Sequence, residues 1–233
     1  MLLPHEFLHY LEQNDAFYGS PNVVILKSRK ISNTYIDQRI FSKDAAKHEP
    51  MLFSLGRVIT EVAKNLGADT VVGIVTTGAV FATYANHATD IPYETIDPHK
   101  DHALSGDIFG KYVLVVDDTC TTGTSIAESI AACREAGAIV VGAFVTVRRD
   151  PNVTHEHLDL ECDDQFVVFC DLDFEVITES TVGEDLANST LMQGLLAGEL
   201  QMRLDIAYAA TDGWHENPDL KGIKFVGEPV IKS

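Results

Sequence analysis

The stretch from Tyr112 to Ser125, which reads YVLVVDDTCTTGTS, joins a strand, two acids and a polar loop in direct succession. Val113 to Val116 form an unbroken, mostly β-branched apolar run, which is typical of a strand buried on both faces of a mostly parallel sheet. Asp117 and Asp118 follow this strand directly. Because ligands of open α/β sheets bind outside the carboxyl ends of the strands, we expect both carboxylates to face a ligand's hydroxyl groups or a hydrated cation.

The loop that follows offers several hydroxyl and backbone N–H donors, and its glycine lets the main chain approach a ligand closely. Residues 126–136 have helical spacing, so the loop is expected at a helix N-terminus, where an anion is favoured. It has neither the spacing of a nucleotide P-loop nor that of a dinucleotide-binding motif. The sequence therefore predicts a phosphate site, and the alternative is a Thr-rich turn after a core strand with two solvated aspartates. The predicted phosphate-binding residues are Thr121, Thr122, Gly123, Thr124 and Ser125.

The whole stretch resembles the phosphoribosyl pyrophosphate (PRPP) motif of the type I phosphoribosyltransferases. That motif consists of four apolar residues, two acids, a short variable pair, and T-x-G-x-S or a close variant. The resemblance implies that Asp117 and Asp118 hold the ribose hydroxyls and that the loop anchors the 5′-phosphate. Cys120 occupies a variable position of the motif and is expected to be a bystander.

Length and charge restrict the remaining possibilities. A chain of 233 residues can bury a full core, and we expect one domain with an appendage. Its 17 Lys and Arg against 35 Asp and Glu give a net charge of −18, spread along the chain, which argues against a nucleic-acid partner. Strand-sized apolar runs, and His5 and Glu6 near the start, predict a cytoplasmic protein without a signal peptide or membrane span.

The cysteines and a histidine pair are expected to play no part in the chemistry. No two cysteines form a C-x-x-C pair, and their contexts suggest a loop, a helix and two strand-like segments, so we expect reduced thiols. His155 and His157 are interpreted as part of a solvated loop, since no third ligand with zinc spacing accompanies them. The four cysteines are Cys120, Cys133, Cys162 and Cys170.

Alternation of helical and strand patterns predicts an α/β protein with a mostly parallel central sheet flanked by helices, the type I phosphoribosyltransferase fold. Helices are expected over residues 3–13, 50–65, 79–87 and 126–136. Strands are expected over residues 23–27, 34–39, 70–75, 113–116, 139–147 and 166–169. The likeness to the family covers residues 1–170, and residues 171–233 are predicted to be a helical extension on the core or at a dimer interface. Within it we expect one or two helices over 182–208 and a last strand over 223–226.

Two further loops are predicted to belong to the same site. Thr77 and Gly78 lie at the start of a helix, where backbone N–H groups suit a pyrophosphate, and the family places its pyrophosphate loop there. Residues 93–110 contain too little apolar surface to pack, and we expect a mobile lid with Lys100 and His102 at its tip. The alternative is a plain surface loop.

Within type I enzymes the chain looks most like the orotate phosphoribosyltransferases. Residues 25–39, with Lys27, resemble that family's Leu-Lys-Ser-Gly-Arg-x-Ser-Pro-x-Tyr segment, so residues 1–42 are expected to form a small N-terminal hood over the base. The likeness makes Lys27 a ligand of PRPP or of the base, and the alternative is an exposed lysine. Lys100 and His102 match the Lys-x-His of a lid that the neighbouring subunit of a homodimer lends. Arg149 matches the arginine that holds the orotate carboxylate, a role that suits a planar guanidinium.

Several positions depart from the family pattern. Arg29, Lys30 and Asn33 replace its Gly, Arg and Pro, and Ala103 replaces the closing Gly of the lid. The lid's Arg-Lys-Glu becomes Ile-Asp-Pro at residues 96–98, so two lid cations are missing. Asp97 is expected to weaken PRPP binding unless another cation compensates. The candidates are Arg29, Lys30 and Lys111.

The predicted function is phosphoribosyl transfer from PRPP to a nitrogenous base. The resemblance favours orotate, with orotidine 5′-monophosphate and pyrophosphate as products, in pyrimidine nucleotide synthesis. Mg²⁺ is the expected cofactor, carried mainly by PRPP, with no direct protein ligand. Two alternatives stay open: a transferase for another base, and a PRPP-binding regulatory protein that has lost catalysis.

Overall fold

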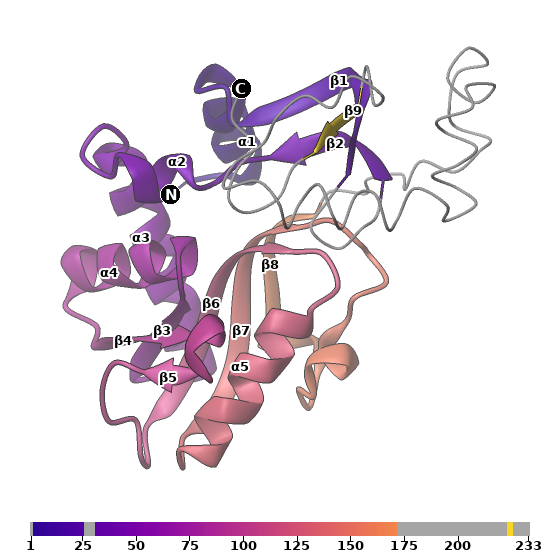
Figure 1. Ribbon diagram of the computed structural model, residues 1–233. Helices are drawn as coiled ribbons and strands as arrows, with labels where there is room; N and C mark the ends of the chain where they lie inside the picture. Colours follow the sequence, from indigo (N-terminus) through magenta and orange to yellow (C-terminus); the bar gives the residue numbers. More distant parts are fainter. Residues whose placement is uncertain (1, 26–30, 172–222, 226–233) are drawn as a thin grey trace. The chain divides into compact units, whose positions relative to one another are not determined.

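The computed structural model describes residues 2–25, 31–171 and 223–225 (Figure 1). The described residues belong to two compact units. The larger consists of residues 2–16 and 37–171, and the smaller of residues 17–25, 31–36 and 223–225. Lys27, Arg29 and Lys30 lie outside the described residues, as do the helices expected over 182–208.

Strands and helices alternate through most of the larger unit, as the sequence predicts. It contains α1 (Pro4–Gln13), α2 (Ile40–Lys43), α3 (Glu49–Leu66), β3 (Thr70–Ile74), α4 (Thr77–Thr89), β4 (Tyr93–Asp97), β5 (Ala103–Leu104), β6 (Tyr112–Cys120), α5 (Thr124–Glu135), β7 (Ile139–Arg148) and β8 (Phe166–Asp171). Single 3₁₀ turns span Pro98–Lys100, His155–Leu158 and Asp163–Gln165.

The strands of the larger unit form a six-stranded sheet in the order β5-β4-β3-β6-β7-β8, and only the short β5 runs antiparallel to its neighbour. From β3 the chain passes through α4 to β4 on one side, and then returns to β6 on the other side of β3. The topological switch point therefore lies between β3 and β6, and α/β sheets bind ligands outside the carboxyl ends of the strands at such a point.

Helices cover the sheet on both sides. Because β3-α4-β4 and β6-α5-β7 advance in opposite directions along the sheet, right-handed crossovers place α4 and α5 on opposite faces. Figure 1 shows α5 crossing β6 and β7. On the α5 side Val113 and Val115 join a buried cluster with Ile126 and Ile130. Alternate strand residues thus supply the two cores, as expected for a strand buried on both faces.

Helix α3 shows how local sequence sets an element. Its apolar residues Leu52, Leu55, Ile59 and Ala63 recur at helical spacing and are all fully buried. The helix ends at Gly67, which has the left-handed φ of 76° that favours glycine at this position. This end agrees with the one predicted from the sequence.

The smaller unit contributes a three-stranded sheet in the order β2 (Ile31–Ile36), β1 (Phe17–Ile25), β9 (Ile223–Phe225). β1 and β2 pair in an antiparallel manner, and β9 pairs in parallel with β1. The strand expected near residue 223 is therefore confirmed over residues 223–225. The strand expected over residues 34–39 ends earlier, at Ile36, because Asp37 and the residues after it form a turn that leads into α2.

The prediction that residues 93–110 lack regular structure is wrong in part. β4 pairs in parallel with β3, and β5 pairs back onto β4. Ile96 and Ile108 are buried in the core, 0% and 1% exposed. The strand was missed because Glu94 and Thr95, near the sheet edge, are polar and half-buried. Ile96 is thus a core residue and no lid position, whereas mobility of the remaining turn stays a prediction.

Within the described part of the chain, none of the helices combines the length and the apolar character needed to cross a lipid bilayer.

Candidate active site

The carboxyl ends of four parallel strands bring most of the predicted site residues to one edge of the sheet. β3 leads into the pyrophosphate loop at Thr77, and β6 carries both aspartates in its second half. β7 ends next to Arg149, and β4 leads into the turn with Lys100. The acids thus lie within β6 and not after it, because pairing with β7 continues to Cys120.

The first turn of α4 forms the predicted pyrophosphate loop. Thr76 is exposed and precedes the helix, whereas Thr77 is only 3% exposed. The peptide bond between Val75 and Thr76 is cis. A Cβ on Gly78 would lie 2.5 Å from the carbonyl oxygen of Val116 and 3.1 Å from Cα of Asp117. Glycine therefore lets the start of α4 lie directly against the strand that carries the acids.

The predicted phosphate loop lies at the start of α5, which begins at Thr124. Gly123 has a φ of 76°, and a Cβ there would come within 3.0 Å of side-chain carbons of Val153 and Leu158, so both backbone angle and space require glycine. Thr122, Thr124 and Ser125 are exposed, and the hydroxyls of Thr122 and Thr124 lie 3.1 Å apart. Exposed hydroxyls at a helix N-terminus suit a phosphate.

Asp117 and Asp118 are each partly exposed, and short backbone hydrogen bonds orient their carboxylates. The N–H of Asp118 donates to Oδ1 of Asp117 at 2.8 Å, and the N–H of Thr119 donates to Oδ1 of Asp118 at 2.6 Å. Burial raises the pKa of Asp118, an effect that hydrogen bonds from Thr119 and Thr77 oppose. The carboxyl group is thus held by its own strand and by the pyrophosphate loop that contains Thr77.

A turn just after β2 supplies residues that the sequence reasoning did not assign to the site. Asp37 is 8% exposed and accepts from Nε of Arg39 at 2.6 Å and from Nζ of Lys43 at 3.2 Å. Burial alone would raise the pKa of Asp37, but the hydrogen bond and charge of Arg39, helped by Lys43, hold it below its usual value. The charge of Arg39 also lowers the pKa of Asp118, and the charge of Asp37 raises it, so the two members of this ion pair act on that carboxyl group in opposite directions.

Replacing Asp37 by alanine is expected to lower the free energy of unfolding by about 3 kcal/mol, because the guanidinium of Arg39 loses its buried partner. Since the pKa of Asp37 is lowered in the folded state, its stabilisation is present above about pH 4 and is lost as the pH falls through the folded value. Urea unfolding at several pH values checks both effects. Asp159→Ala, which breaks an exposed ion pair with Arg134, should show a far smaller loss. Equal losses in the two variants would contradict this prediction.

Two adjacent arginines at the end of β7 have different surroundings. Nε and Nη2 of Arg148 donate to the two carboxylate oxygens of Asp171, and Nη1 donates to the carbonyl oxygen of Val153 at 3.0 Å. The guanidinium of Arg148 lies over the ring of Phe166. It therefore ties β7 to β8 and to the following loop. Arg149 is 7% exposed, and its backbone N–H donates to the carbonyl oxygen of Cys120 at 2.8 Å. This hydrogen bond places Arg149 beside the end of β6, the strand that carries the acids.

The two predicted lid residues each lie near a carboxylate of the same chain. Nζ of Lys100 is 3.3 Å from Oδ2 of Asp97, and its side chain is 78% exposed. Nε2 of His102 is 3.8 Å from Oε2 of Glu128 on α5. The structure thus brings the turn to the helix that starts at the phosphate loop.

Three of the four cysteines are buried thiols. Burial raises the pKa of Cys120, Cys133 and Cys170 to about 12 each, which makes these thiols poor nucleophiles. Cys120 lies in β6 and not in a loop, and Cys162 precedes a 3₁₀ turn and not a strand. Among the described residues, no group of three His, Cys, Asp or Glu side chains is placed to hold a metal ion.

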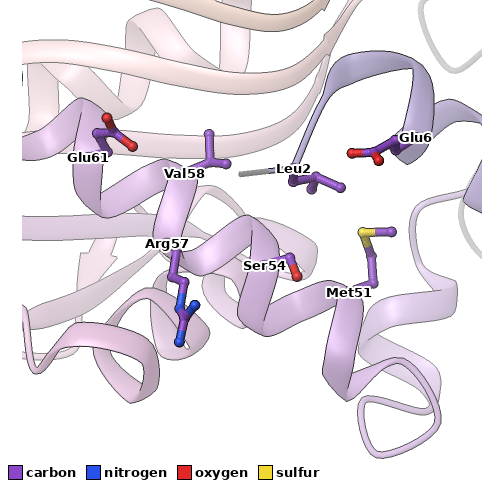
Figure 2. A pocket seen from close by; sticks show the side chains of 7 residues that line it. All are labelled: Leu2, Glu6, Met51, Ser54, Arg57, Val58 and Glu61. Carbon is purple, nitrogen blue, oxygen red and sulfur yellow. The ribbon is translucent and has the colours of Figure 1, made fainter.

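A pocket of about 560 Å³ lies elsewhere, between α1 and α3 (Figure 2). None of the predicted site residues lines it, and it combines apolar side chains with exposed charged ones. It therefore does not bear on the candidate active site. Its lining consists of Leu2, Glu6, Met51, Ser54, Arg57, Val58 and Glu61.

Known proteins resemble this chain in sequence and in structure, although no protein-family model matches it. It is 34% identical over 134 residues to the orotate phosphoribosyltransferase of Corynebacterium glutamicum, a match that covers 54% of this chain and 71% of that protein. It is 33% identical over 132 residues to the orotate phosphoribosyltransferase of Sulfolobus acidocaldarius, covering 54% of this chain and only 64% of that relative. The matched part therefore spans less than two thirds of the Sulfolobus protein.

The crystal structure of orotate phosphoribosyltransferase from Aeropyrum pernix has a TM-score of 0.58 and 26% sequence identity to this chain. The match covers 70% of this chain and 92% of that one. The predicted α/β fold is thereby confirmed.

Proposed function

Because the chain belongs to the orotate phosphoribosyltransferase family, we propose that it transfers the phosphoribosyl group of PRPP to orotate, as a step of pyrimidine nucleotide synthesis. The observation that carries this proposal is the meeting of the acid pair with two helix-start loops at the switch point of the sheet. A sugar with a phosphate at one end and a pyrophosphate at the other presents groups that suit these three features.

In the proposed reaction the bond between C1 of the ribose and the pyrophosphate oxygen breaks, and its electron pair leaves with pyrophosphate. A ring nitrogen of orotate then donates the electron pair of the new bond to C1. The ribose carries positive charge between these events, and the carboxylates of Asp117 and Asp118 offset it while they hold the ribose hydroxyls. The products are orotidine 5′-monophosphate and pyrophosphate.

Each predicted binding residue has a part in this scheme. The hydroxyls and N–H groups of residues 121–125 bind the 5′-phosphate, and the N–H groups of Thr77 and Gly78 bind the pyrophosphate. Lys100 and His102 bind the leaving pyrophosphate and, by covering the site, exclude water. Arg149 binds the orotate carboxylate. Lys27 is assigned to PRPP or the base on the sequence resemblance alone.

Magnesium is proposed as a cofactor that arrives mainly with the substrate. Mg²⁺ prefers oxygen ligands, which the diphosphate and the ribose hydroxyls would supply. The carboxylates of Asp117 and Asp118 would lie near the ion through these hydroxyls, without ligating it directly. When bound, the ion neutralises charge on the diphosphate.

The assembly and location are also proposals. A homodimer in which each subunit lends its lid to the other follows from the family resemblance, and two-fold symmetry is the usual form of such an exchange. A cytoplasmic location accords with four cysteines that form no disulfide.

Replacing Lys100 by alanine is expected to lower turnover about 10- to 100-fold and to leave thermal stability unchanged. Turnover falls because a cation at the leaving pyrophosphate is lost. Stability is unaffected because the ammonium group is exposed and its pair with Asp97 lies at the surface. Pyrophosphate release and thermal unfolding measure the two effects, with His99→Ala in the same turn as the matched control. Unchanged turnover in Lys100→Ala would remove Lys100 from the site.

The function itself is tested by mixing the protein with PRPP, Mg²⁺ and one base per well: orotate, uracil, adenine, hypoxanthine or guanine. Pyrophosphate release with orotate alone supports the proposal. Release with another base keeps the mechanism and replaces the substrate. Binding of PRPP without release of pyrophosphate would favour the alternative of a regulatory protein that has lost catalysis. The pairing of Lys100 with Asp97 is compatible with that alternative, because it engages the lid cation within its own chain.

A further inference from the structure

Two buried side chains from distant parts of the chain meet at the carbonyl group of Asp118. Nε2 of Gln38 donates to this carbonyl oxygen at 3.0 Å and also to Oγ1 of Thr119 at 3.0 Å. Oγ1 of Thr146 lies 2.5 Å from the same carbonyl oxygen and 2.7 Å from Oε1 of Gln38. The single hydroxyl proton of Thr146 is therefore shared between these two acceptors.

The opposite end of the same peptide unit orients the acid. The N–H of Thr119 belongs to the peptide whose carbonyl Gln38 and Thr146 hold, and it donates to Oδ1 of Asp118 at 2.6 Å. Because a peptide unit is planar and rigid, fixing its oxygen also fixes the direction of its N–H. Gln38 thus acts on the Asp118 carboxylate through one covalent unit.

Burial indicates that this arrangement supports the site without touching a ligand. Gln38 is 1% exposed and Thr146 is 0% exposed. Both amide protons of Gln38 already have acceptors, and its oxygen faces the hydroxyl of Thr146. The neighbours Asp37 and Arg39 are joined by an ion pair, which holds the turn that carries Gln38.

We propose that Gln38, supported by Thr146, is a positioning residue for the carboxylate of Asp118. The inference rests on the proposed function, in which Asp118 contacts the ribose of PRPP. Misplacement of a reacting or stabilising group by about 1 Å costs up to about 100-fold in rate, so loss of this support should appear in kcat. A purely structural role would lower stability alone.

The test compares Gln38→Met with Thr146→Val and Thr146→Ser, each also combined with Asp118→Asn. Thr60→Val is the matched control, because Thr60 is equally buried and hydrogen-bonded, to Gly56 and Thr89, away from the acids. We expect Gln38→Met and Thr146→Val to lower kcat about 10- to 100-fold and to raise the Kd for PRPP by a smaller factor, because Asp118 also holds the ribose hydroxyls. Thr146→Ser keeps the hydroxyl and should retain nearly full kcat.

The combined variants separate positioning from other effects. If Gln38 acts through Asp118, Gln38→Met should lower kcat less than about twofold further once Asp118 is asparagine, since coupled residues are not additive. Equal losses in both backgrounds, or a loss of melting temperature like that of Thr60→Val with kcat unchanged, would overturn the proposal. If Gln38→Met does not fold, the Thr146→Val and Thr146→Ser pair decides by the same criteria.

Failure of the proposed function gives a different pattern. Wild-type protein that binds PRPP but releases no pyrophosphate with any base rejects the transferase, and positioning is then measured by PRPP affinity. In that case Gln38→Met should raise the Kd for PRPP in the wild-type background and leave it unchanged in Asp118→Asn. The same Kd in wild type and Gln38→Met would overturn the positioning role independently.

Discussion

Replacing Asp118 by asparagine is expected to lower kcat for phosphoribosyl transfer by about 10²- to 10³-fold, the range found when one group that stabilises transition-state charge is removed. Asparagine has nearly the same shape and can still accept the hydrogen bond from the N–H of Thr119. The variant therefore removes the negative charge beside the reacting carbon and leaves the surrounding contacts in place.

The same substitution should leave the fold equally stable or make it more stable at neutral pH. Burial raises the pKa of Asp118, so the folded state holds the proton more tightly than the unfolded state. The favourable contribution of the protonated form is complete below about pH 4 and is lost as the pH rises through the folded pKa. The stability of Asp118→Asn relative to wild type should therefore increase over that rise.

Turnover and urea unfolding across this pH range measure the two opposite effects. Asp159→Asn removes an exposed carboxylate that pairs with Arg134 in the last turn of α5, and it serves as the control, with kcat unchanged. A loss of kcat that merely follows a loss of folded protein would contradict the role assigned to Asp118. So would full activity of the asparagine variant.

The sequence was sufficient to predict those parts of the fold that depend on neighbouring residues. The apolar run Val113–Val116 predicted a strand buried on both faces, and it is one. The helices expected over residues 50–65 and 126–136 are present as α3 and α5, and Gly67 and Gly137, which follow them, both have a positive φ. Short-range hydrogen bonding and burial decide such elements, so a local pattern contains the needed information.

Contacts between distant residues were beyond the reach of such patterns. Gln38 and Thr146 are 108 positions apart, and nothing in either local segment indicates that they share a carbonyl group. Glutamine is mostly exposed in proteins, so the residue type alone would predict that Gln38 lies at the surface. The acid pair could therefore be predicted from the sequence, whereas the residues that position it could not.

The predicted lid shows how a family likeness can mislead at single positions. Ile96 stands where the family pattern has a lid cation, yet it is fully buried in β4. Its side chain fills the core beside β3, so an arginine there would have to be buried. Only one of the two lid cations that the family pattern has is therefore missing from the lid, at the position of Asp97. The carboxylate of Asp97 lies 3.3 Å from Nζ of Lys100.

Arg149 is expected to decide which base the enzyme accepts. Replacing it by methionine should lower kcat/KM for orotate by about 30- to 5,000-fold, since truncating one partner of a buried charge pair costs about 2–5 kcal/mol. The Kd for PRPP should stay within about threefold of wild type. Arg149→Lys keeps the charge but loses the planar fork, so its kcat/KM should lie between the two.

Steady-state kinetics with orotate and calorimetric PRPP binding check this expectation, and Arg134→Met, which removes a surface arginine, is the control. Arg149 is 7% exposed, so the methionine variant is first tested for folding, and the lysine variant decides if it unfolds. Equal losses of orotate turnover and PRPP affinity would move Arg149 out of the base pocket. Arg148 is held by Asp171 and is therefore not available to replace the lost guanidinium. A selective loss of orotate use would thus identify Arg149 as the residue that binds the orotate carboxylate.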